Sequence, residues 1–89
     1  MDIQRWKTFS RQQQLLMVAS EIKRAATWQA SDRELFQDAL LRCTELIDLL
    51  KQDSKWEPLS DAVHVLANEV EKYAHGVRTD DIQYLYRAL

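Results

Sequence analysis

Apolar residues recur at intervals of three and four along most of the chain, which is the spacing of one face of an α-helix. The first stripe predicts a helix over residues 11–29, where Ser10 and Gln13 have the spacing of a capping box. No strong helix breaker precedes Ser10, so a helix that runs through from residue 2 fits the sequence equally well. The stripe consists of Leu15, Val18, Ala19, Ile22, Ala25 and Ala26.

A second helix is predicted from Ser31 to about Lys51. Ser31 can cap it, and Glu34 can return a hydrogen bond to the amide of the capping residue. Its apolar residues cover nearly half of the circumference, which is typical of a central helix packed on two neighbours. These residues are Leu35, Phe36, Ala39, Leu40, Cys43, Leu46, Ile47 and Leu50.

The only proline and the only glycine bracket the third predicted helix. It is expected to begin between Lys55 and Pro58, because proline is well suited to the first helical position. Gly76 is expected to end it in the left-handed conformation, with Val77 supplying the hydrophobic contact that often accompanies such an end. A short fourth helix is predicted over residues 82–89, capped by the segment 79–81.

Short connections between three long helices and a short fourth one favour antiparallel neighbours. The predicted fold is therefore all-α, an antiparallel up-down helical bundle that forms a single domain over residues 1–89. No apolar run approaches the roughly 20 residues that a membrane-spanning helix needs. We therefore expect no membrane partner.

The distribution of charge bears on how the helices pack, and the cysteine content bears on the cellular compartment. The chain has a net charge of −2, with five basic and two acidic side chains in residues 1–28 and three basic and six acidic ones in residues 31–53. This asymmetry favours first and second helices that lie side by side, and the alternative is a basic arm for an external anion. The single cysteine, Cys43, allows no intrachain disulfide, and no signal-peptide hydrophobic region follows the N-terminus. A cytoplasmic location is expected.

Candidate chemistry is sparse, and we predict no enzyme and no cofactor. Cys43 falls within an apolar stripe, which favours a buried, unreactive thiol. A chain with one glycine cannot form a glycine-rich phosphate loop. His64, Glu71 and His75 share one face of the third helix and could bind zinc or iron, although that face is where an amphipathic helix places its solvated residues. We keep metal binding as a minor alternative.

The segment from Arg5 to Arg11 interleaves three bases with Trp6 and Phe9, a pattern that can bind single-stranded nucleic acid by stacking and charge. Three bases are few, and the pI of about 5.6 is far below that of most nucleic-acid-binding domains. Packing of the two aromatic rings on the bundle is preferred. A nucleic-acid-linked regulator remains the alternative function.

Several large apolar side chains lie off the core stripes. Trp6, Met17 and Trp28 are eleven residues apart, so a continuous first helix would align them on one face. Leu41 falls on the polar side of the second helix. Tryptophan and methionine are favoured at protein interfaces, so these four residues are the predicted interface of a homo-oligomer or accessory subunit. The alternative is that the N-terminal segment or the fourth helix covers this side.

Four segments carry a resemblance to a known group of proteins. They are residues 20–25, Trp28, residues 41–49 and residues 53–56. Together they resemble a group of small, uncharacterised, all-helical bacterial proteins over residues 21–73. The resemblance implies a bacterial cytosolic helical bundle. It implies no activity, so no residue role carries over to this chain.

Overall fold

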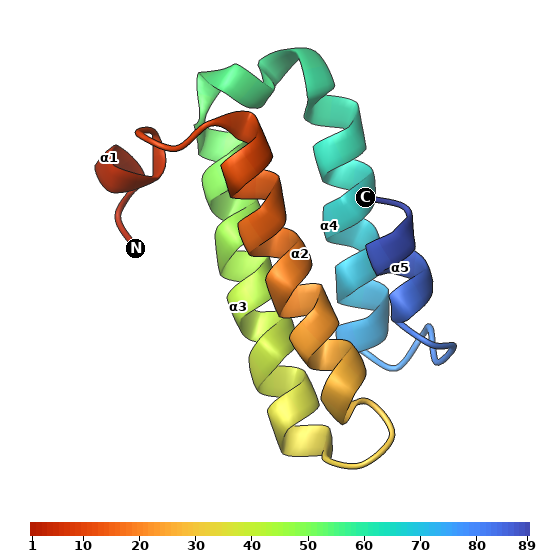
Figure 1. Cartoon of the computed structure of the whole chain (residues 1–89). Helices are drawn as coiled ribbons and strands as arrows, with labels where there is room; N and C mark the ends of the chain where they lie inside the picture. The colour runs from red at the N-terminus through yellow and green to blue at the C-terminus, as the bar shows by residue number, and fades with distance from the viewer.

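A computed structural model describes all of residues 1–89, and every regular element in it is helical. This confirms the all-α class. Three helices are long, and two short ones lie near the ends of the chain (Figure 1). The elements are α1 (Ile3–Trp6), α2 (Arg11–Trp28), α3 (Arg33–Gln52), the 3₁₀-helix η1 (Ser54–Leu59), α4 (Ser60–Ala74) and α5 (Gln83–Arg87).

The long helices α2, α3 and α4 lie side by side, and the chain reverses direction between one and the next (Figure 1). The central helix is α3, which packs against both α2 and α4, as its wide apolar stripe predicted. One continuous cluster of 17 buried residues forms the core, with contributions from α1, η1 and α5 as well as from the long helices. Because α2 and α4 flank α3, one side of the bundle between them is left for the C-terminal segment.

The start of α2 shows why α1 is a separate helix. The Gln13 amide donates to Ser10 Oγ at 3.1 Å, and the Ser10 amide donates to Gln13 Oε1 at 2.9 Å, so the predicted capping box is confirmed. A capping residue has an extended backbone, and Ser10 has φ −68° and ψ 162°. The helix therefore cannot run through from residue 2, and that alternative is wrong.

The start of α3 differs from the prediction by one residue. The Asp32 carboxylate, and not the Ser31 hydroxyl, accepts the hydrogen bond that caps the helix, from the Leu35 amide at 3.0 Å. The Ser31 amide still donates to the Trp28 carbonyl in the last turn of α2. Ser31 and Asp32 are both suitable capping residues. Ser31 is still bonded to the last turn of α2, so Asp32 is the residue with the extended backbone that a cap requires.

Helix α4 begins at Ser60, which is later than predicted, because residues 54–59 form η1. Pro58 lies inside that 3₁₀-helix. Proline has no amide to donate and disfavours helical geometry at the residue before it, so a regular α-helix starts only beyond it. Asp53 caps η1 by accepting a hydrogen bond from the Lys55 amide at 3.0 Å.

The end of α4 follows the prediction in its backbone only. Gly76 has φ 73°, and the Val77 amide donates to the Lys72 carbonyl at 2.9 Å, as in a Schellman motif. Val77 is 75% exposed, so the prediction that it supplies a hydrophobic contact is wrong. The last helix, α5, ends at Arg87, and the predicted capping segment supplies Asp81, whose Oδ1 accepts from the Gln83 amide at 2.9 Å.

None of the helices combines the length and the apolar character that crossing a membrane requires.

Candidate functional site

The four residues predicted as an interface do not form one surface. Trp6 is fully buried in the core, and Met17 and Trp28 are half-buried against it. Leu41 alone is largely exposed, at 59%. Because the helix is interrupted at Ser10, Trp6 belongs to α1 and does not continue the line of Met17 and Trp28. The expectation of Trp6 as an interface residue is wrong, and the preferred packing of its ring on the bundle is confirmed.

A buried glutamine holds that segment in place. Gln14 has no accessible surface, and its Nε2 donates to the Trp6 carbonyl at 2.8 Å and to Asp53 Oδ2 at 3.0 Å. Its Oε1 accepts a hydrogen bond from Trp56 Nε1 at 2.6 Å. We call these four residues the N-terminal latch. It joins α1, α2 and the corner that leads from α3 into η1, and it leaves Trp6 Nε1 as the one buried side-chain polar atom without a partner.

The carboxylate of the latch is held ionised. Burial by itself raises the pKa of Asp53, but hydrogen bonds from Lys55 and Gln14, together with the charge of Lys55, outweigh it and lower the pKa below its ordinary value. Lys55 Nζ lies 2.8 Å from Asp53 Oδ2 and also donates to the Lys7 carbonyl at 3.0 Å. The latch is therefore a structural device, in which the polar atoms of Gln14 are all bonded to other latch residues.

The N-terminal segment does not offer the stacking surface that the nucleic-acid alternative needs. Arg5, Lys7 and Arg11 are exposed and form no ion pair. Trp6 is buried and Phe9 is half-buried. The bases are free, but the rings on which nucleotides would stack are turned into the protein.

The metal-binding alternative and the cysteine also have no site geometry. His64, Glu71 and His75 are exposed on α4, and His75 Nε2 lies 4.0 Å from Glu71 Oε1. Nowhere do three or more histidine, cysteine or acidic side chains gather as a metal ion would require. Burial, with a smaller contribution from Glu21, raises the pKa of Cys43 to about 12. That thiol is protonated at neutral pH and is no nucleophile.

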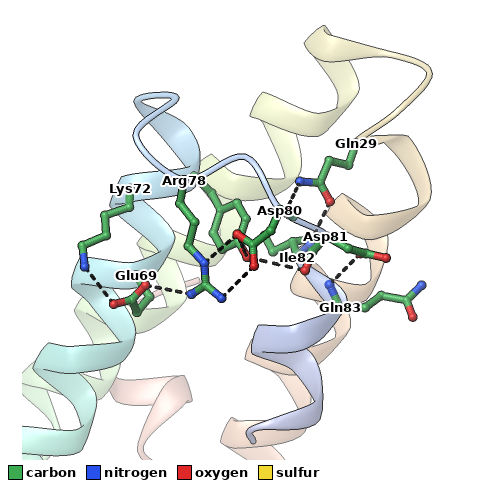
Figure 2. A network of polar contacts seen from close by, with 9 residues as sticks. Gln29, Glu69, Lys72, Arg78, Asp80, Asp81, Ile82 and Gln83 are labelled. Atoms are coloured by element: carbon green, nitrogen blue, oxygen red, sulfur yellow. Dashed lines mark hydrogen bonds and ion pairs between the residues drawn. The ribbon is translucent and has the colours of Figure 1, made fainter.

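Helix α5 is docked by a second polar network, which is only partly buried (Figure 2). Arg78 bridges the connection, with Nη1 2.8 Å from Glu69 Oε2 and Nε 2.8 Å from Asp80 Oδ1. Gln29 of α2 reaches across, donating to the Asp80 carbonyl and accepting from the Ile82 amide, both at 2.8 Å. We call this network of Gln29, Glu69, Arg78 and Asp80 the C-terminal clasp.

The charges of the clasp shift its titrating groups. Hydrogen bonds from Lys72 and Arg78 lower the pKa of Glu69, and the hydrogen bond from Arg78 lowers that of Asp80. Burial, followed by the hydrogen bond to Asp80, raises the pKa of Tyr73 to about 12. Beneath the clasp, Ile82 and Leu85 of α5 are buried in the core. The short helix is thus fixed against the bundle at its start.

An apolar hollow begins where α5 ends. It has a volume of about 290 Å³ and lies among α2, η1, α4 and the end of α5. Eleven of the twelve residues that line it are hydrophobic, the exception being Glu69. Hollows elsewhere are more polar, such as the one of about 240 Å³ between α3 and α4, where three of ten lining residues are hydrophobic. We call the apolar hollow at the end of α5 the open groove. It is defined by Leu15, Leu59, Ala62, Val65, Leu66, Leu85, Ala88 and Leu89.

Exposed apolar side chains lie at the α4 edge of the open groove and beyond it on α2. Val65 on α4 and Leu16 on α2 are each 60% exposed. Leu16 lines a second hollow, of about 420 Å³, between α2 and α5, and this hollow shares Leu15 and Leu89 with the open groove. The two hollows and their rims therefore form one connected apolar surface around the end of α5, and it is the best candidate site on the molecule.

Sequence reasoning missed this surface. Leu16 and Val65 lie outside the predicted apolar stripes, and a single exposed apolar residue needs no explanation. Leu59 has the spacing of the apolar stripe of the third helix, but it is 43% exposed. The signal that could have found them is that all three fall in the apolar stripes or beside their residues, on segments that become neighbours in the fold. The predicted interface instead consists of Trp6, Met17, Trp28 and Leu41, and its alignment of Trp6 with Met17 assumes a continuous first helix.

In comparisons with known proteins, no family model, no curated protein and no solved structure matches this chain. The resemblance to small helical bacterial proteins therefore stays a prediction.

Proposed function

We propose that this antiparallel up-down bundle is a small protein-interaction module, and that it associates with protein partners through the open groove and its exposed rims. Self-association is the first case to test. The observation that carries the proposal is the lining of the groove, where eleven of twelve residues are hydrophobic. Burial of apolar surface is worth about 25 cal/mol per Å², so covering this area with a partner is favourable.

Its anatomy supports the proposal. A typical interface has an apolar centre with a polar rim. Here the apolar centre lies between Leu16 and Val65, and polar residues such as Gln12 and Asp61 surround it on the outer helix faces. We infer the cytoplasm as the setting, because the one cysteine is free and buried.

The proposal is tested by the mass of the protein in solution, measured by light scattering over a hundredfold concentration range. We expect the wild-type chain to associate as the concentration rises, and the double variant Leu16→Glu/Val65→Glu to remain monomeric. The matched control is Leu41→Glu, which places the same charge at an equally exposed leucine on α3. It should associate as the wild type does.

Two results would count against this assignment. If Leu41→Glu abolishes association while the groove variant does not, the interface lies on the outer face of α3. If the wild-type chain is a monomer throughout and also binds none of the helical peptides described below, the open groove is no interaction site. Circular dichroism of each variant shows whether the helices are intact.

A further inference from the structure

The open groove continues the line of α5 along the bundle. Leu85, Ala88 and Leu89 form one end of it, and η1 contributes Trp56 and Leu59 at the other. In Figure 1 the C-terminus lies beside the middle of α4. At 1.5 Å per residue, α4 is about 22 Å long and α5 only about 8 Å. Helix α5 therefore lies beside only part of α4, and the groove lies beside the remainder.

The two rims of the groove differ in charge. On α4, Asp61, Val65 and Glu69 follow one another at intervals of four, so an apolar side chain stands between two carboxylates. On α2, the corresponding interval places Gln12, Leu16 and Ser20, which carry no charge.

The two carboxylates on α4 are not equivalent. Glu69 is engaged by Lys72 at 3.0 Å and by Arg78 at 2.8 Å. Asp61 is exposed and has no ion pair, so it is the unpaired carboxylate on this rim. On the α2 side the adjoining hollow is lined by a base, Arg87 of α5.

We infer that the open groove binds an amphipathic helix of a partner protein that carries lysine or arginine on the flank over α4 and uncharged residues on the flank over α2. This inference rests on the proposed function and names the partner element for the same site. The apolar stripe of such a helix fills the groove in the line of α5. The basic flank meets Asp61, which fixes the direction of the helix, because charges at a rim act on specificity and orientation more than on affinity.

The test uses two labelled synthetic peptides of fourteen residues that share one leucine stripe and one glutamine flank. The other flank is lysine in the first peptide and glutamate in the second. Binding to the full-length protein is measured by fluorescence anisotropy at low and high salt. We expect the lysine peptide to bind at least fivefold more tightly at low salt. We also expect the difference to shrink at high salt, where exposed charges are screened.

Variants of the protein assign the effect to the rim. Asp61→Lys should reverse the preference for the lysine peptide, and Asp61→Asn should abolish it. Asp38→Lys is the matched control, since Asp38 is an exposed, unpaired carboxylate on α3. It should leave the preference unchanged. Leu16→Glu/Val65→Glu should prevent binding of both peptides.

The outcomes separate this inference from the function on which it rests. Equal binding of the two peptides, or a preference that Asp61→Lys does not alter, overturns the charged-helix partner. If no peptide binds but the groove variant abolishes self-association, a second copy covers the groove, so the proposed function stands and this inference fails. If neither peptide binding nor self-association is seen, both fail.

Discussion

The two ends of the chain are fastened to the bundle by opposite means. The N-terminal latch is buried and centres on an uncharged amide, Gln14, whose polar atoms are all bonded within the protein. The C-terminal clasp is partly exposed and centres on Arg78, which bridges two carboxylates. A buried polar network is costly to break, because the partners left behind cannot turn to water, whereas exposed ion pairs are worth little and are screened by salt.

The two fastenings hold different parts of the bundle. The latch lies at the N-terminal end of α2, next to its capping residue Ser10. The clasp holds α5, the element that borders the open groove. The polar fastening of α5 therefore consists of partly exposed ion pairs, which contribute less to stability than a buried network does.

Replacing Gln14 by alanine should produce the largest effect. It removes hydrogen bonds to the Trp6 carbonyl, Asp53 and Trp56 Nε1 and leaves these groups buried without partners. We expect the free energy of unfolding to fall by about 3 kcal/mol, as measured by urea denaturation. The adjacent Gln12 is exposed, so Gln12→Ala is the control and should change stability little. A similar loss in both variants would mean that the latch adds nothing beyond helix propensity.

An intermediate effect is expected from acid. The pKa of Asp53 is lowered in the folded state, so its contribution is complete above the unfolded value of about 3.9 and is lost as the pH falls through the folded value. The stability difference between wild type and Asp53→Asn should therefore be constant near pH 7 and shrink below about pH 4. Urea denaturation at several pH values measures it. A difference that does not change down to pH 2 would show that the carboxylate is not held ionised by the latch.

The smallest effect is expected at the clasp. Arg78→Gln removes the bridge between Glu69 and Asp80, and the loss of stability should be clearly smaller than for Gln14→Ala. It should also decrease when the salt concentration is raised from about 0.05 to 1 M, which the latch variant should not show. Thermal unfolding of both variants at the two salt concentrations measures this. Equal salt dependence at the two sites would remove the distinction between the fastenings.

Local features of the fold could be predicted from the sequence. The capping box at Ser10 and the helix end at Gly76 depend on residues within one turn, and both were found. The cap at Asp32 was misplaced by one residue, because Ser31 beside it has equally suitable chemistry. The residue types indicate that a helix begins here. The path of the preceding connection decides which of the two neighbouring residues caps it.

The candidate site could not be predicted, because it depends on distant contacts. Trp6 is buried through a glutamine bonded to Asp53, 39 residues further along the chain, and no periodicity reports such a pair. The open groove exists because α2 and α4 flank α3 and because α5 ends early. Leu16 and Val65 become one surface only once that arrangement is known.

The latch also has a consequence for the order in which the chain acquires its structure. Its partners in residues 53–56 are synthesised long after Trp6 and Gln14, and Lys55 must be present before it can bond the Lys7 carbonyl. Contacts between residues far apart in sequence carry a loop-closure cost that contacts within one helix do not. We therefore expect the latch to form after the helices that it joins, when the corner between α3 and α4 closes.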